Sequence, residues 1–191
     1  MTALLRSILF AASEILHIAV FAQTSPNATP ECVPHQLKAS TPPGPDGGAG
    51  NSASVFQASN ISQETCNLTG VPILRLLNER HEPMNLAICS NCVDYIFPPR
   101  AIRTVTLHPG DSAHFLIGLR FADESESGCG RLSRIDVLLE GRTRPLEFGF
   151  AGLRVCGKIN VSAWRSGVYT AKELERDSVG GNGTGFGRSA Y

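Results

Sequence analysis

One stretch of alternating side chains limits the possible folds of this chain more than any other feature. Between residues 112 and 121 the apolar positions recur at every second residue, and they are Ala113, Phe115, Ile117, Leu119 and Phe121. The intervening positions include Ser112, His114, Gly118 and Arg120. Successive side chains of a β-strand point to opposite faces, so this period predicts a strand buried on one face and solvated on the other.

Other segments repeat this pattern and are separated by turn signals. Residues 105–107 precede the turn sequence of residues 108–111, and we expect them to form a hairpin with the strand that follows. Residues 135–139 and 146–150 flank a second turn at residues 141–143. Shorter strands are expected at residues 55–58, 73–76 and 155–161, and no segment before residue 170 has a sustained helical period. Seven or more short strands predict an all-β fold, an antiparallel β-sandwich, with a barrel as the alternative.

The cysteines and the N-terminus together indicate export. The six cysteines are an even number, as expected for disulfides in an oxidising compartment. Arg6 precedes a mostly apolar run over residues 8–21, and Ala22 suits signal-peptidase cleavage. Glu14 and His17 interrupt the run, which is too short and too polar for a stable membrane span. We therefore expect a secreted or periplasmic, extracytoplasmic protein.

Composition divides the rest of the chain. We expect a signal peptide over residues 1–22, a linker over 23–31, a β-sandwich domain over 32–168 and a flexible Gly-rich tail over 169–191. Residues 40–53 are rich in proline and glycine and read as a long loop.

Charge gives no reason to expect binding to nucleic acid or to an anionic membrane. Lysine plus arginine and aspartate plus glutamate both total 17, so the formal net charge is zero. A local basic run consists of Arg131, Arg134, Arg142 and Arg144. Solvated strand faces and a turn explain this run, and an anion site is the alternative.

Several short motifs resemble one bacterial family, and their order and spacing agree with it. They are CVPHQL at 32–37, NIS at 60–62, CNLTGVP at 66–72, LHPGDSA at 107–113, Cys129, and CGKINVS at 156–162. The chain is similar to domain of unknown function family 4232, whose members are secreted or membrane-tethered modules.

The resemblance implies an immunoglobulin-like sandwich, an extracytoplasmic location and the disulfide pairs Cys32–Cys66 and Cys129–Cys156. It implies no activity. The long loop at 40–53 and the additional pair Cys89 and Cys92 depart from the family pattern.

Cys89 and Cys92 have the spacing of a redox motif. No βαβ pattern surrounds them, and Pro98 and Pro99 follow soon after, so we interpret the pair as a small disulfide that pins a long loop. Two alternatives are a redox-active pair and a metal site, for which the available histidines are His81, His108 and His114.

Three further features have structural interpretations. Ser112 and His114 could suggest a hydrolase, but they sit where a turn enters a strand and lack an indicated acid or oxyanion hole. Trp164, the only tryptophan, is expected to cap the core. The N-x-S/T sequons are either glycan acceptors or, as we prefer, polar strand ends and turns; they begin at Asn27, Asn60, Asn67, Asn160 and Asn182.

The sequence therefore predicts a non-catalytic extracytoplasmic module that needs no cofactor and serves in binding or structural support at the cell envelope. Its partner would be a protein or a cell-envelope ligand of unknown identity. The loops at 40–53 and 80–101 are the candidate sites, because loops on rigid scaffolds carry function. The alternative is a secreted thiol–disulfide redox protein that uses Cys89 and Cys92.

Overall fold

A computed structural model describes residues 28–42, 51–94, 97–120, 129–139, 143–170 and 172. The predicted signal peptide, most of the loop at 40–53 and almost all of the Gly-rich tail lie outside these residues. The elements are η1 (Pro34–Gln36), β1 (Leu37–Ser40), β2 (Asn51–Asn60), β3 (Cys66–Leu68), β4 (Ile73–Asn78), β5 (Ala87–Ser90), β6 (Val105–Leu107), β7 (Ser112–Arg120), β8 (Cys129–Leu138), β9 (Leu146–Cys156), β10 (Lys158–Val161) and β11 (Arg165–Ser166).

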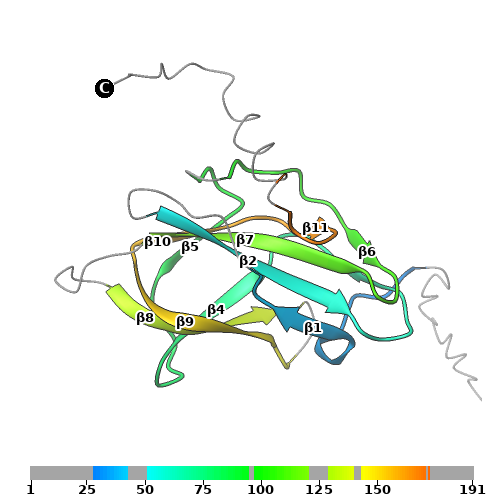
Figure 1. The fold of residues 1–191 in the computed structure, drawn as a ribbon, viewed down its shortest axis with the longest axis horizontal. Coiled ribbons are helices and arrows are strands. Elements are labelled where there is room, and N and C mark those ends of the chain that lie inside the picture. The colour runs from blue at the N-terminus through cyan, green and yellow to red at the C-terminus, as the bar shows by residue number, and fades with distance from the viewer. Residues whose placement is uncertain are drawn as a thin grey trace, which may run out of the picture.

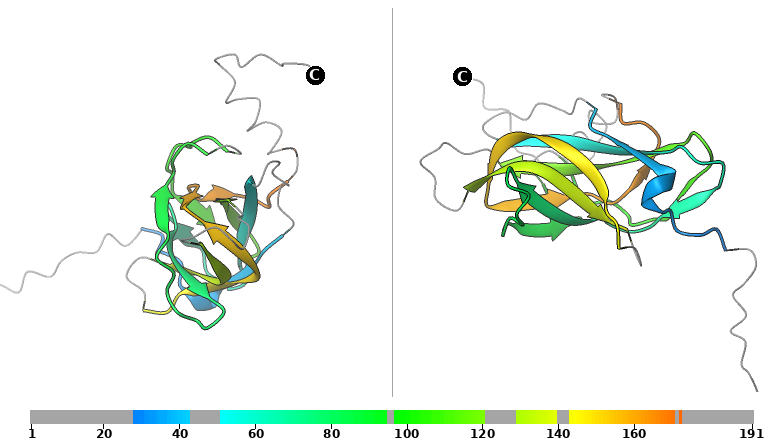
Figure 2. Two further views of the ribbon diagram at one scale, coloured as in Figure 1. Left: turned by 90° about the vertical axis from the view of Figure 1, so that its left-hand side faces the viewer. Right: turned by 90° about the horizontal axis from the view of Figure 1, so that it is seen from below.

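The strands form a sandwich of two main sheets, and in Figure 1 strands β7 and β10 of one sheet lie above β8 and β9 of the other; Figure 2 gives two further views. The larger sheet has the order β1-β2-β7-β10-β5, and β11 pairs with β7 beyond the end of β10. The smaller sheet has the order β4-β8-β9, and β3 pairs with β6 separately. The predicted all-β, immunoglobulin-like antiparallel sandwich with disulfides is confirmed, although β5 runs parallel to β10.

Aromatic side chains fill the space between the sheets. Phe56 and Phe115 stack with their ring centroids 5.3 Å apart, and Phe148 from the smaller sheet meets both rings edge-on. Trp164 is 4% exposed and packs edge-on against Phe115 with a centroid distance of 4.8 Å, so its predicted capping role is confirmed. The predicted hairpin at residues 135–150 also forms, and it pairs Ile135 with Phe148.

The prediction that the strand at 112–121 is half-buried is wrong, because β7 is buried on both faces. His114 and Leu116, on the face away from the main core, have no solvent-exposed surface. Leu116 belongs to a second apolar cluster with Ala53, Val55 and Phe97. The segment that follows β5 therefore covers the outer face of the larger sheet, and a single strand's period gives no sign of such a cover. Phe121 lies outside the described residues.

The hairpin predicted between residues 105–107 and 113–121 is also wrong. The turn itself forms, with the Asp111 amide donating to the His108 carbonyl oxygen at 3.0 Å. However, β6 pairs with β3, whereas β7 pairs with β2 along its whole length. The backbone amide of Asn60 donates to the backbone carbonyl oxygen of Asp111, and the backbone amide of Gly110 donates to the backbone carbonyl oxygen of Asn60. These bonds fix the turn against the end of β2, so the chain crosses between sheets there.

Two strand boundaries differ from the sequence prediction. The expected strand at 155–161 is divided at Gly157, whose φ of 69° ends β9 and starts β10 in the other sheet. The expected loop at 40–53 is shorter, since β1 includes Ser40 and β2 begins at Asn51. Pairing with the long β7 extends β2 on both sides of the predicted 55–58. The strands β1, β3 and β5 lie in segments for which no strand was predicted.

Three disulfides tie the fold together, and they join the pairs expected from the sequence. Cys32–Cys66 fastens the start of the domain to β3, and both residues are buried. Cys129–Cys156 joins directly opposed positions of β8 and β9. Cys89–Cys92 closes a short ring at the end of β5. Within the described part of the chain, no helix has the length and apolar character needed to cross a membrane.

Candidate functional site

A tight hairpin extends from the end of β4 and forms one wall of a surface hollow. The Asn78 side chain holds the hairpin through three hydrogen bonds. Its Oδ1 accepts hydrogen bonds from the backbone amides of Arg80 and Glu82 at 2.8 and 2.9 Å. Its Nδ2 donates to the Glu82 side chain at 2.9 Å. His81 takes a left-handed φ of 61°, which reverses the chain. The Met84 amide then donates to the Leu76 carbonyl oxygen at 2.9 Å and returns the chain along β4.

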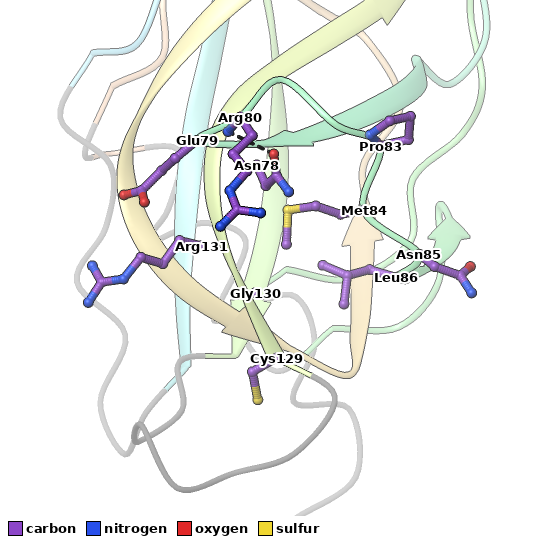
Figure 3. A pocket seen from close by; sticks show the side chains of 10 residues that line it. All are labelled: Asn78, Glu79, Arg80, Pro83, Met84, Asn85, Leu86, Cys129, Gly130 and Arg131. Atoms are coloured by element: carbon purple, nitrogen blue, oxygen red, sulfur yellow. Dashed lines mark hydrogen bonds between the residues drawn. The ribbon is translucent and has the colours of Figure 1, made fainter.

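The hollow lies between this hairpin and the first residues of β8, and its volume is about 340 Å³. β4 pairs with β8 only as far as Asn78 opposite Leu132, while β8 begins three residues earlier, at Cys129. Figure 3 shows the lining residues, which are Asn78, Glu79, Arg80, Pro83, Met84, Asn85, Leu86, Cys129, Gly130 and Arg131. Five of these ten residues fall within the predicted functional region 80–101.

The floor of the hollow is apolar and its rim is charged. Met84 lies directly against Gly130, since a Cβ on that glycine would be 2.6 Å from the Met84 Cε. Met84 and Leu86 also pack against the main core. In Figure 3 the Arg80 side chain extends into the middle of the hollow, whereas Glu79 and Arg131 extend outward. This arrangement can bind a small group that carries both an apolar and an anionic part.

The Cys89–Cys92 pair lies in a pinned turn. Asn91 has a φ of 55°, and its amide donates to the Val161 carbonyl oxygen on β10. Its side chain donates to the Arg100 carbonyl at 2.6 Å and accepts the Arg100 amide at 3.0 Å. The disulfide therefore closes a turn that anchors the segment covering the outer face of the larger sheet. Among the described residues, no α-helix begins at Cys89, as it would in a thioredoxin-like site.

The three candidate metal-binding histidines lie in different places. His81 is exposed in the hairpin, His108 lies in the turn before β7, and His114 is buried on β7. His108 Nδ1 lies 3.2 Å from the Thr65 hydroxyl, and His114 Nδ1 lies 2.9 Å from the Gly167 carbonyl oxygen. Within the described ranges, no three metal-binding side chains converge.

Ser112 and His114 each have a structural partner. Both lie on β7 two residues apart and so share a face, as the sequence suggests. The Ser112 hydroxyl is 2.8 Å from that of Ser59 on β2, and His114 holds the chain at Gly167. These contacts fasten the strands at one end of the larger sheet.

The basic run does not form one cluster. Arg134 ion-pairs with Asp136 at 3.0 Å and with Glu147 at 3.5 Å on the outer face of the smaller sheet. Arg131 donates to the Gly152 carbonyl oxygen at 3.5 Å, Arg144 is exposed, and Arg142 lies outside the described residues. The interpretation as solvated strand faces misses one feature. Asp136 is wholly buried beneath arginine side chains. The sequence signal for it is a carboxylate at an outward-facing position of the strand pattern.

The described sequon asparagines use their amide nitrogens in structural hydrogen bonds. Nδ2 of Asn67 donates to the Thr29 carbonyl at 3.1 Å, and Nδ2 of Asn160 donates to Asp94 at 2.5 Å. Asn60 is 1% exposed, and its Nδ2 donates to the carbonyl oxygens of Glu64 and Leu107. A glycan on any of these nitrogens would replace those bonds, which supports the structural interpretation. Asn27 and Asn182 lie outside the described residues.

Replacing Asn60 by alanine should lower the free energy of unfolding by about 2 kcal/mol, because buried backbone groups lose their partners. Urea unfolding monitored by the fluorescence of the single tryptophan measures the change. Asn85→Ala is the matched control: Asn85 is exposed, so its change should stay within about 0.5 kcal/mol. Equal effects of the two substitutions would contradict a structural role for Asn60.

A family model matches residues 32–165 of the chain, and its description is "Domain of unknown function (DUF4232)". The chain belongs to this family. The match covers every strand from β1 to β10, so the DUF4232 domain is the sandwich itself. Neither the curated proteins nor the solved structures include a significant match. For this DUF4232 domain, the geometry of its surface is therefore the guide to function.

Proposed function

We propose that this DUF4232 domain is a non-catalytic binding module that acts outside the cytoplasm, at the cell envelope. The observation that supports binding best is the hollow beside the hairpin of residues 78–83. It combines an apolar floor of Met84 and Leu86 with a charged rim at the edge of a rigid sandwich. Rigid scaffolds that present such concave sites on loops are typical of recognition domains.

Two features support the extracytoplasmic part of the proposal. All six cysteines take part in disulfides, which persist in oxidising compartments and are rare in the cytosol. The N-terminal sequence has the charge and apolar pattern of a secretory signal. A disulfide framework also suits a domain that must stay folded without cellular chaperones.

Photo-crosslinking from the rim of the hollow tests the function. A photoreactive amino acid is placed at the exposed Asn85 in one variant and at the exposed Gln63, between β2 and β3, in the other. In the cells that naturally make the protein, we expect a discrete adduct from position 85 that is absent from position 63. It should be recovered from the extracytoplasmic fraction. No adduct, or the same adducts from both positions, would count against a binding role for the hollow.

A further inference from the structure

We propose that the hollow recognises the free C-terminus of a partner protein whose last side chain is apolar. In this mode Arg80 holds the terminal carboxylate and Met84 and Leu86 receive the side chain. The inference rests on the proposed binding function and names its ligand class.

The Arg80 guanidinium supplies the cation of the proposed site. Other arginines on this side of the molecule are engaged: Arg75 and Arg134 contact Asp136, and Arg131 contacts the Gly152 carbonyl. Arg80 interacts only through its backbone amide, with Asn78, so within the described residues its guanidinium has no ion-pair partner. Figure 3 shows that side chain directed into the hollow. A planar guanidinium presented in this way matches a carboxylate, which it can bind through two parallel hydrogen bonds.

An apolar floor lies below that cation. Met84 reaches across the backbone of Gly130, where the missing Cβ gives it room. Methionine adapts its shape to apolar groups of different form, and Leu86 extends the apolar surface beside it. A ligand that places a carboxylate on Arg80 therefore has an apolar surface within reach for its own side chain. An α-carboxylate next to an aliphatic side chain provides both groups on one residue.

The size of the hollow limits the kind of ligand that it can bind. Sites for whole small molecules occupy roughly 300–1,000 Å³ and enclose most of the ligand surface. At about 340 Å³ this hollow is at the lower limit, and its rim residues Glu79, Arg80 and Asn85 are exposed. It therefore suits the end of a longer chain that continues into solvent better than a fully enclosed small acid. Capture of a C-terminal carboxylate is an established mode of peptide recognition.

Fluorescence anisotropy with synthetic peptides tests the inference. The probe is fluorescein-Gly-Ser-Gly-Thr-Val-Leu with a free carboxylate. Two comparison peptides have either a C-terminal amide or serine as the last residue, and unlabelled hexanoate is the small-acid competitor. We expect binding of the probe, at least tenfold weaker binding of both comparison peptides, and competition by hexanoate only in large excess.

Three variants separate this mode of binding from general adhesion. Arg80→Gln should weaken probe binding at least tenfold, since a charge-assisted contact is lost. Arg103→Gln, at an exposed arginine that does not line the hollow, should leave it unchanged. Gly130→Val should push Met84 into the hollow and weaken the probe more than a peptide ending in alanine. Unchanged melting temperatures show that the variants are folded.

The outcomes distinguish this inference from the proposed function. Equal binding of acid and amide peptides, or equal effects of Arg80→Gln and Arg103→Gln, would overturn C-terminal recognition. Tight binding of hexanoate would assign the hollow to small acids and would overturn it as well. If no peptide binds but Asn85 still crosslinks specifically, the ligand class is wrong and the binding function stands. If Asn85 also gives no specific adduct, both fail.

Discussion

Replacing both Cys32 and Cys66 by alanine should lower the free energy of unfolding by about 3–4 kcal/mol. The bond closes a loop of 34 residues, and its loss restores that loop's freedom to the unfolded chain. The whole stability of a small domain is roughly 5–15 kcal/mol, so this loss is a large part of it. Both residues are buried, and alanine avoids placing a hydroxyl group in the core. Urea unfolding under non-reducing conditions measures the change.

The matched control is the double variant Cys89→Ala with Cys92→Ala. That bond spans a sequence separation of only 3, and the same loop-closure relation gives about 1.5–2 kcal/mol. We therefore expect the loss of Cys32–Cys66 to be about twice as costly. If the two double variants were equally destabilised, loop closure in the unfolded chain would not explain the role of the framework disulfide.

The second large effect is expected for Asp136→Asn, which should cost about 2–4 kcal/mol. Asp136 has no exposed surface, and its Oδ2 accepts hydrogen bonds from Arg75 Nε at 3.1 Å and Nη2 at 2.5 Å. Arg134 Nε lies 3.0 Å from Oδ1, an ion pair that is not aligned as a hydrogen bond. The neutral amide leaves two guanidinium groups without their shared anion and turns an N–H group toward one of them. Arg75 is 48% exposed and can turn to water, so the expected cost is lower than for a fully buried pair.

Glu147→Gln provides the control for Asp136→Asn. Glu147 lies opposite Asp136 on β9 and contacts Arg134 at 3.5 Å, but its side chain is 55% exposed. An exposed pair of this kind contributes at most about 1 kcal/mol, so the variant should unfold at nearly the wild-type urea concentration. If Asp136→Asn lowered the free energy of unfolding no more than Glu147→Gln does, burial of the carboxylate would not add to the stability of the domain.

The fold class could be predicted because period-two patterns report directly on strand faces. The pattern at 135–150 gave the right hairpin, since its two strands are neighbours in sequence as well as in space. The pattern at 105–121 led to a wrong hairpin. The partner of β7 is instead β2, which ends more than 45 residues before the turn, and the backbone of Asn60 at its end bonds to that turn. Pairing between distant segments has no local signal in a single sequence.

The candidate site was predictable in part. The region 80–101 could be selected because it is long and irregular, and half of the residues that line the hollow lie there. Its other wall could not be predicted, because residues 129–131 meet the hairpin only through the register of β4 on β8. The position of Arg80 at the hollow could not be predicted either, because an exposed arginine in a polar turn looks like any other until its neighbours are known. The pair Cys89 and Cys92 has the spacing of a redox motif, but it anchors the segment that covers the outer face of the larger sheet.

The parallel pairing of β5 with β10 has a consequence for the order in which the domain matures. Ala87 pairs with Lys158, which lies 71 positions later in the chain, so the one strand that pairs with β5 among the described residues comes near the end of the domain. Contacts this distant form late, because the intervening chain must first be confined. A chain exported from its N-terminus would therefore carry β5 across the membrane long before the partner strand of β5 has followed. The turn closed by Cys89 and Cys92 would likewise be anchored only after β10 has crossed, since the Asn91 backbone amide donates to the Val161 carbonyl oxygen.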